Sequence, residues 1–177
     1  MESLDCILQR RSVRKYKDEQ LPREMIEKII DYTKYAPSWA NTKVVRYMCV
    51  VDKELKSKLA NCSDPANAHY IEQAPALFVL TAVKGRCGTD RRGGIYYHTP
   101  KEWLMFDAGI AAQTLCLVAY DLGVSTLIMG VFDGDRYVDL LDIPEDQELV
   151  AIISAGYADE KPVAPKRKET SEILQIL

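Results

Sequence analysis

A cluster of cations surrounds one serine near the start of the chain, in the stretch RRSVRKY. The residues are Arg10, Arg11, Ser12, Arg14 and Lys15. Arg10, Ser12 and Arg14 alternate, so in an extended segment their side chains point the same way. Two guanidiniums with a hydroxyl between them suit a phosphate group, because a guanidinium binds two phosphate oxygens at once. Solvated surface charge is the alternative, and the spacing alone leaves both open.

A second basic cluster, PKRK, lies in the C-terminal tail and contains Lys166, Arg167 and Lys168. If the fold brings the chain ends together, the two clusters would clamp one phosphate. The net charge of the chain is −3, so no overall field draws nucleic acid or an anionic membrane to it. The basic clusters are therefore expected to act locally.

Two further stretches read as turns that could contact a ligand, one through polar groups and the other through exposed backbone. The stretch APSWANTK, Ala36–Lys43, presents Ser38, Asn41 and backbone amides, or is an ordinary loop after a helix that stops at Pro37. In IMGVFDGD, Gly130 directly follows an expected strand, where backbone could lie close to a flat ligand. The alternative there is a plain strand-to-helix turn. Neither turn matches a P-loop or a dinucleotide-binding fingerprint.

The composition predicts one globular domain of 177 residues. Five cysteines occur without a CxxC pair, and the first 16 residues are charged rather than apolar. This pattern predicts a cytoplasmic protein with free, mostly buried thiols. The two histidines and the scattered cysteines form no short-range group, which argues against a zinc site.

Hydrophobic periodicity places helices and strands in alternation, which is typical of a layered α/β or α+β domain. The expected helices are Ser3–Arg11, Pro22 to just before Pro37, Lys53–Ala60, Leu104–Tyr120 and Asp135–Leu141. The expected strands are Val44–Val51, Pro75–Val83, Val124–Phe132 and Leu149–Tyr157, with the second of them central in the sheet. The stretch Lys84–Pro100 is the one long irregular segment.

The long helix is apolar around its whole circumference, with 13 apolar residues among the 17 from Leu104 to Tyr120. The stretch Trp103–Gly123 could mimic a membrane span, but Asp107, Gln113 and Asp121 interrupt it, which argues against that interpretation. The tail also ends in apolar residues, Ile173, Leu174, Ile176 and Leu177. A two-fold homodimer would cover both surfaces. A three-layer monomer with this helix at its centre is the alternative.

Four motifs in order along nearly the whole chain resemble the FMN-dependent nitroreductase family. They are RRSVRKY, APSWANTKVVRY, the stretch from MFDAGIAAQ to IMGVFD, and ISAGYADEKPVAPKRK. The resemblance implies one domain over residues 1–177 with an α+β fold. It further implies a three-layer α/β/α sandwich with a mostly antiparallel central sheet, a long central helix at a homodimer interface and an extended C-terminal tail.

The resemblance assigns the basic residues to FMN. Arg10, Arg11 and Ser12 would serve the phosphate and ribityl end, completed by Arg167 with Lys166 or Lys168. Arg14 would lie at the flavin N1/O2 edge, where its charge stabilises the reduced, anionic flavin. No further catalytic side chain is expected, since the flavin carries the chemistry.

The two turns receive roles from the same resemblance. Pro37, Ser38 and Asn41 would reach the flavin from the partner subunit, and the backbone of Met129 and Gly130 would approach N5. Trp39 stands where the family usually has a small residue, and would stack over or narrow the substrate side of the flavin. Lys43 and the following VVRY also depart from the family pattern.

The activity that the resemblance implies is a ping-pong reaction in which NADH or NADPH reduces FMN and a small-molecule acceptor, such as a nitroaromatic or a quinone, reoxidises it. A relative with different flavin chemistry, such as an enone reductase or a reductive dehalogenase, is one alternative. A flavin-binding module without turnover is another. The segment Lys84–Pro100, with Arg91, Arg92, Tyr96 and Tyr97, would form a lid or contact the donor, or else be a plain surface loop.

Overall fold

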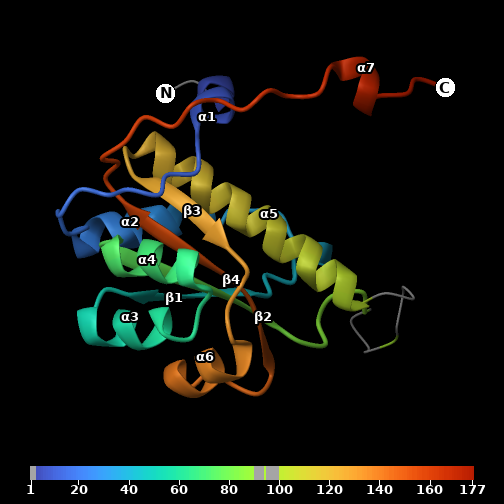
Figure 1. Cartoon of the computed structure of the whole chain (residues 1–177). Helices are drawn as coiled ribbons and strands as arrows, with labels where there is room; N and C mark the ends of the chain where they lie inside the picture. The colour runs from blue at the N-terminus through green and yellow to red at the C-terminus, as the bar shows by residue number, and fades with distance from the viewer. Residues whose placement is uncertain (1–2, 90–93, 95–99) are drawn as a thin grey trace.

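An antiparallel sheet forms the middle layer of the molecule (Figure 1). The computed structural model describes residues 3–89, 94 and 100–177. Within these residues the sheet has four strands in the order β1-β2-β4-β3, and every neighbouring pair is antiparallel. The strands are β1 (Val45–Val50), β2 (Ala76–Val83), β3 (Ser125–Met129) and β4 (Gln147–Gly156). All four predicted strands are confirmed, with their ends shifted by a few residues.

The burial of strand β2 on both faces reflects the layered architecture. All eight of its residues are buried, because both faces of the sheet are covered. Successive side chains of a strand point to opposite faces, and accordingly Phe78 and Leu80 join one core while Leu77 and Val79 join the other. The predicted central position of this strand is therefore confirmed.

One outer layer contains α2 (Arg23–Thr33) and α5 (Pro100–Asp121), with the short α1 (Ser3–Gln9) against the end of α5. Its core joins Ile29 of α2 and Leu115 of α5 to Phe78 and Ile153 of the sheet. Helix α5 thus lies on one face of the sheet (Figure 1). The alternative that a single chain buries this helix at its centre is wrong.

The other outer layer contains α3 (Lys53–Ala60), α4 (Pro65–Gln73) and α6 (Gly134–Leu141). Leu59, Ile71 and Tyr137, one from each helix, pack on Leu77 and Ile152 of the sheet. Each helix begins at an aspartate whose carboxylate accepts a backbone N–H of the first turn, the three being Asp52, Asp64 and Asp133. The predicted α+β sandwich of three layers is confirmed, whereas helix α4 had no counterpart among the predicted helices.

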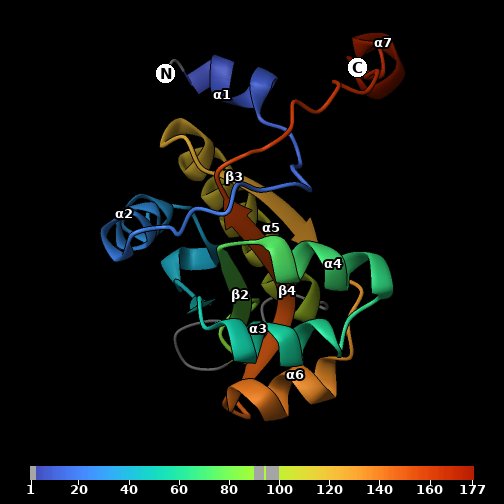
Figure 2. The same ribbon diagram turned by 60° about the vertical axis from the view of Figure 1, so that its left-hand side comes forward.

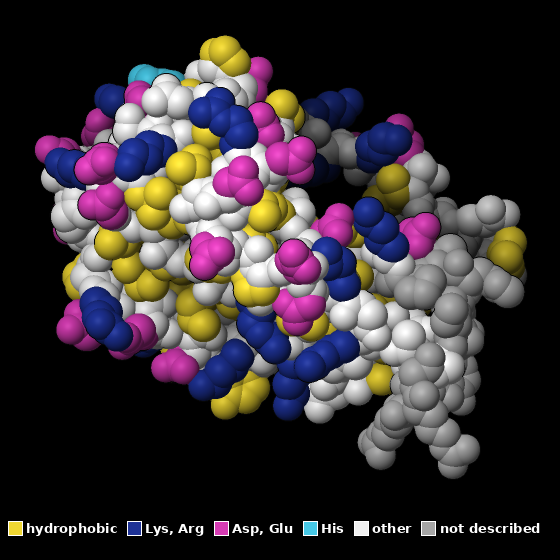
Figure 3. All heavy atoms as spheres, turned by 90° about the horizontal axis from the view of Figure 1, so that it is seen from below, with side chains coloured by type: hydrophobic (Ala, Val, Ile, Leu, Met, Phe, Trp, Pro, Cys, Tyr) yellow, Lys and Arg dark blue, Asp and Glu magenta, His cyan; other side chains and the backbone are white. Residues whose placement is uncertain are grey.

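The chain after β4 is an extended, exposed tail that contains a single turn of helix, α7 (Thr170–Ile173). Helices α1 and α7, the first and last described elements, lie at the same end of the molecule (Figures 1 and 2). The face drawn in Figure 3 carries basic and acidic side chains interspersed, with apolar patches between them. Helix α5, over Lys101–Asp121, has the length and apolar composition of a membrane span, yet part of it is buried against the sheet and α2.

Candidate functional site

The basic segment, which we define as Arg10–Tyr16, lies beside the edge strand β3 and pairs with it. Ser12 forms a parallel bridge with Thr126, and the backbone N–H of Val13 donates to the Thr126 carbonyl at 3.1 Å. The side chain of Val13 is buried, while Arg14 is exposed. The chain is therefore extended at Ser12 and Val13, the condition under which alternate side chains point the same way, and the backbone pairing fixes where the neighbouring arginines emerge.

The arginines of this segment differ in what they bind. The guanidinium of Arg11 donates to the carbonyls of Leu8 and Arg10, at 2.7 and 2.8 Å, and so closes the last turn of α1. Among the described residues, no carboxylate lies within 4 Å of the guanidinium of Arg10 or Arg14, although the backbone N–H of Arg14 donates to Glu160. The guanidinium of Arg14 donates one long hydrogen bond, of 3.5 Å, to the carbonyl of Ser12. Within the described part of the chain, both guanidiniums thus lack a carboxylate partner and are available to an anion.

A buried tyrosine fixes the far end of the basic segment. The hydroxyl of Tyr16 donates to the carbonyl of Val13 at 2.9 Å and lies 2.9 Å from Oγ of Ser154. Burial raises the pKa of this phenol well above its usual value. The Tyr16 ring also lies against Gly156, where a Cβ atom would come within 2.9 Å of it. The segment around Arg14 is therefore held from both ends.

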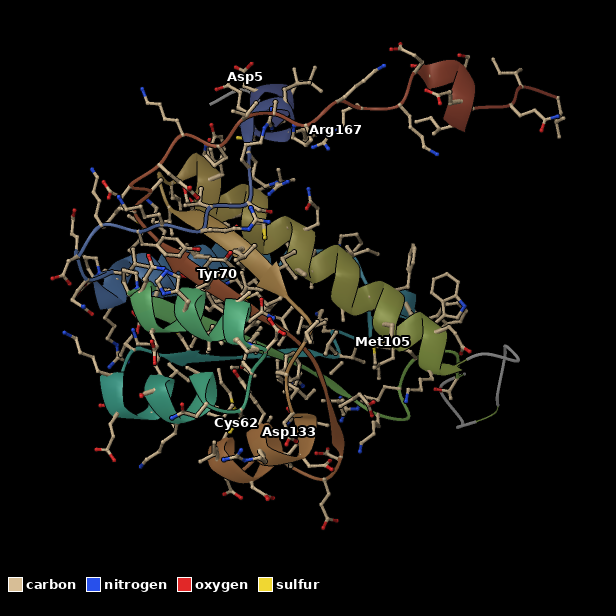
Figure 4. All side chains as sticks on the ribbon, viewed as in Figure 1. Asp5, Cys62, Tyr70, Met105, Asp133 and Arg167 are labelled. Carbon is tan, nitrogen blue, oxygen red and sulfur yellow. The ribbon has the colours of Figure 1, made fainter. Side chains whose placement is uncertain are left out.

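The tail that carries the second basic cluster first contacts the basic segment and then extends away from it. The backbone N–H of Asp159 donates to the carbonyl of Lys15 at 2.9 Å, and the two side chains form an ion pair at 2.8 Å. Beyond this contact the tail is exposed, including Lys166, Arg167 and Lys168. Figure 4 shows Arg167 at the end of the molecule where α1 lies. No hydrogen bond among the described residues joins this cluster to Arg10 or Arg14.

Strand β3 connects the basic segment to Gly130. Thr126 pairs with Ser12, and Gly130 follows four residues later, about 13 Å along an extended chain. The side chain of Met129 is buried in the core under α6, so its backbone is what it offers at the surface. A Cβ atom at Gly130 would meet no atom within 4 Å. Packing within the chain therefore does not require glycine here, whereas a ligand lying against the backbone would.

The predicted polar loop has a strained backbone. It contains one turn of 3-10 helix, Trp39–Asn41, and Ala40, Asn41 and Lys43 have φ angles of 42°, 57° and 53°. Residues other than glycine adopt this left-handed conformation at a cost, and it persists where neighbouring groups enforce it. Ser38 supplies one such restraint, because its hydroxyl oxygen accepts the N–H of Lys43 at 2.9 Å. A shallow hollow of about 270 Å³ borders the loop at Pro37 and Ser38.

Asp107 of α5 is the main restraint on this loop. Both of its carboxylate oxygens lie 2.9 Å from the backbone nitrogen of Trp39, and its side chain is buried. The thiol of Cys87 donates to the same carboxylate at 3.2 Å. Burial, with the neighbouring Asp107 charge, raises the pKa of Cys87 to about 12. From the sequence, Asp107 was noted only as a charged residue within an apolar helix. Its apolar neighbours were the one available sign that this carboxylate is buried.

Aromatic side chains cover the outer side of this loop. The rings of Trp39 and Trp103 lie 4.6 Å apart, and Phe106 meets Trp103 edge-on at 5.2 Å. Phe106 is 58% exposed. These three residues form an aromatic cluster near the N-terminal end of α5. Such a cluster can stack against a flat ligand.

The two parts of the predicted site lie at opposite ends of α5. The loop is bound to Asp107, whereas α1, which leads into the basic segment, is bound through the thiol of Cys6 to Asp121 at 3.6 Å. Fourteen residues separate these aspartates, about 21 Å along a helix. A single chain therefore does not bring Pro37, Ser38 and Asn41 to Arg10 and Ser12.

The irregular segment predicted as a lid falls mostly outside the described residues, and this includes Arg91, Arg92, Tyr96 and Tyr97. All five cysteines are free, and four of them are buried. The prediction of free, mostly buried thiols is thereby confirmed. Burial raises the pKa of Cys49 to about 11 and also raises that of Cys116, so these thiols are protonated at neutral pH.

Comparison with known proteins identifies relatives along the whole chain. The model of the nitroreductase family matches residues 7–157. A protein of Archaeoglobus fulgidus, provisionally named NADH dehydrogenase/NAD(P)H nitroreductase, is 30% identical over 90% of this chain and 88% of its own length. An FMN reductase [NAD(P)H] of Bacillus subtilis is 28% identical over 81% of this chain and 61% of its own length.

A solved structure agrees with these relatives. The FMN-dependent nitroreductase of Clostridium difficile R20291 superposes with a TM-score of 0.74, covering 96% of this chain and 94% of its own, at 25% identity. The family model covers well over half of the chain, and it spans both the basic segment and the loop bound to Asp107. The chain belongs to the nitroreductase family.

Proposed function

We propose that this protein is an FMN-dependent oxidoreductase that acts as a homodimer in the cytoplasm, with NADH or NADPH as electron donor and a small-molecule acceptor. The observation that carries the proposal is the position of the two half-sites at opposite ends of α5. A two-fold related copy that lies antiparallel along α5 would bring the loop of one chain to the basic segment of the other.

The residues present fit a flavin mononucleotide. Arg10 and Arg14 have guanidiniums without a carboxylate partner among the described residues, which suits a phosphate and an electron-rich ring edge. Gly130 leaves its backbone open directly after β3, the strand that pairs with Ser12. The curated relative of B. subtilis is named for FMN and NAD(P)H.

Each group of residues has a task in this proposal. Arg10 and Ser12, with Arg167 and its neighbours in the tail, hold the phosphate and ribityl chain. Arg14 places positive charge at the N1/O2 edge and so favours the reduced cofactor. The partner's loop excludes water and positions Trp39 over the open face. When bound, the flavin supplies the hydride and electron chemistry, so the protein needs no acid–base side chain.

The homodimer is supported by the apolar surface that one chain leaves exposed. Leu4, Ile7 and Leu8 of α1 are 71%, 56% and 68% exposed. A hollow of about 500 Å³ lies between α1, α2 and α5 and is lined by Ile7, Leu117 and Val118 among others. The apolar end of the tail, Ile173–Leu177, is also exposed. Apolar patches of this kind on a folded chain mark interaction surfaces.

The visible absorption spectrum of the purified protein, before and after anaerobic NADH or NADPH, tests the proposal. A flavin spectrum that bleaches on addition of the donor supports the enzyme. A flavin that stays oxidised favours a binding module, and no flavin after reconstitution with FMN contradicts the proposal. A screen of nitroaromatic, quinone, enone and halogenated acceptors then separates the alternatives in chemistry.

The binding residues are tested by the FMN dissociation constant. Arg10→Ala removes a charge-assisted contact, so we expect roughly 10- to 100-fold weaker binding. Arg23→Ala is the matched control, because Arg23 is an exposed arginine that pairs with Glu27 at 2.7 Å on α2. Equal affinities of the two variants would contradict the role given to Arg10.

A further inference from the structure

A polar cavity lies away from the proposed flavin site, where the chain after Tyr16 crosses α3 and the end of α4. Its volume is about 430 Å³, within the range of pockets that hold small metabolites. It is lined by residues 16–18 and 20, by α3, by the last two residues of α4 and by the turn between α4 and β2. None of the residues assigned to FMN lines it.

Lys56 is the buried cation of this cavity. It is 4% exposed, and its ammonium group donates a hydrogen bond to the carbonyl of Ala74. Among the described residues, no carboxylate lies within 4 Å of this ammonium. Lys58, two residues further along α3, is by contrast exposed and pairs with Glu54 at 2.7 Å.

A lysine in this state is unusual, because a buried ammonium is normally paired with a carboxylate. The ammonium has three donors, and the structure gives one of them an acceptor. Burial lowers the pKa of Lys56, and the nearby Lys53 charge lowers it further. A negative group in the cavity would offset both effects and accept the remaining hydrogen bonds.

The other lining residues indicate what such a ligand looks like. Lys53 and Lys17 are exposed and border the cavity, and the hydroxyl of Ser57 and the amide of Gln73 add neutral polar groups. Asp18 and Glu72 also line it. These carboxylates disfavour a large polyanion and suit a ligand that carries hydroxyl or amino groups beside its acid.

We propose that this cavity binds the oxyanion group, carboxylate or phosphate, of a small polar metabolite, with Lys56 at its base and Lys53 and Lys17 at its rim. Such a ligand would join three segments that are far apart in sequence: the chain after Tyr16, α3 and the α4–β2 turn. The proposal does not depend on the proposed oxidoreductase function.

The test is thermal unfolding of the purified protein, with and without FMN, in phosphate, in acetate and in sodium chloride of equal ionic strength. A ligand that binds the folded state alone raises the midpoint with the logarithm of its concentration once this exceeds the dissociation constant, by about 4 °C at ten times that constant. Phosphate and acetate distinguish the two classes of oxyanion. A rise of this form with at least one of them, absent in chloride, is expected. Stabilisation by neither overturns the proposal.

Four variants locate the effect. Lys56→Met should abolish the rise that phosphate or acetate produces, whereas Lys58→Met should keep it and so corrects for general salt effects. Arg10→Ala should also keep it, which separates this cavity from the proposed FMN phosphate site. If Lys56→Met does not fold, Lys53→Met serves instead and should raise the dissociation constant, obtained from the dependence of the midpoint on anion concentration, at least threefold. A rise that persists unchanged in Lys56→Met, or an unchanged dissociation constant in Lys53→Met, overturns the proposal.

Discussion

Both carboxylate oxygens of Asp107 lie 2.9 Å from the backbone nitrogen of Trp39, across 68 residues of sequence. This contact ties the polar loop to the first half of α5. The same loop contains Ala40, Asn41 and Lys43 in left-handed conformations, which need an external restraint to persist. A carboxylate that touches no proposed ligand therefore determines where the loop presents Ser38 and Asn41.

The substitution Asp107→Asn tests this restraint. An amide offers one acceptor oxygen in place of two and turns an NH₂ group toward the N–H of Trp39 or the thiol of Cys87. We expect the free energy of unfolding to fall by roughly 1–3 kcal/mol and the FMN dissociation constant to rise. Thermal unfolding and FMN titration measure the two effects. Asp139→Asn, the same substitution at an exposed position of α6 in the other outer layer, is the control and should change neither.

Much of the fold was predictable because its signals are local. Helix α3 has the predicted bounds, Lys53–Ala60, since Asp52 caps a regular pattern of apolar residues. Helix α4 was missed because PANAHYIEQ has a weak apolar stripe, although Asp64 followed by Pro65 was an available start signal. The strand order β1-β2-β4-β3 depends on contacts between distant segments, which periodicity does not encode.

The candidate site also has some features that the local sequence predicts and others that it does not. The basic cluster around Ser12 could be recognised from local sequence alone, whereas its extended backbone results from pairing with Thr126, 114 residues away. The roles of Asp107 and Lys56 could not be predicted, because each bonds to a backbone group distant in sequence, at Trp39 and Ala74 respectively. In a single sequence, Lys56 resembles any charge on the exposed face of a helix.

The backbone at Gly156 approaches its neighbours too closely for a side chain. A Cβ atom there would lie 2.5 Å from Cδ of Pro75 and 2.9 Å from Cδ1 of Tyr16. We expect Gly156→Ala to lower the free energy of unfolding by about 1–3 kcal/mol, because neither the proline ring nor the buried tyrosine can move freely. Urea unfolding measures the change. Gly134→Ala, where a Cβ would meet no atom within 4 Å, should stay within about 0.5 kcal/mol of the parent protein.

Alkaline pH should destabilise the protein through the half-buried thiol of Cys49. Burial raises the pKa of Cys49 from 9.0 to about 11. Below pH 9 both states keep the proton. Between pH 9 and 11 the unfolded chain loses it first, so the free energy of unfolding falls as pH rises, by about 1.4 kcal/mol per pH unit from this group.

The contribution of Cys49 is isolated by comparing urea unfolding at pH 8 and pH 10.5 in the parent protein and in Cys49→Ser. The serine variant does not titrate in this range, so its stability should fall less steeply with pH, whatever its stability at pH 8. Parallel pH profiles of the two proteins would show that Cys49 titrates normally in the folded state.

A substitution on the exposed side of α1 tests whether two chains together form the flavin site. Ile7 is 56% exposed in the single chain and lines the hollow beside α5. A glutamate there costs a monomer little, whereas it would place a charge inside an apolar interface. For Ile7→Glu we therefore expect at least a tenfold larger dimer dissociation constant, measured by size-exclusion chromatography with light scattering, and a parallel loss of FMN affinity. Val51→Glu is the control, since Val51 is 46% exposed directly after β1. A monomeric parent protein, or an Ile7→Glu variant that dimerises as the parent does, would contradict a flavin site built from two chains.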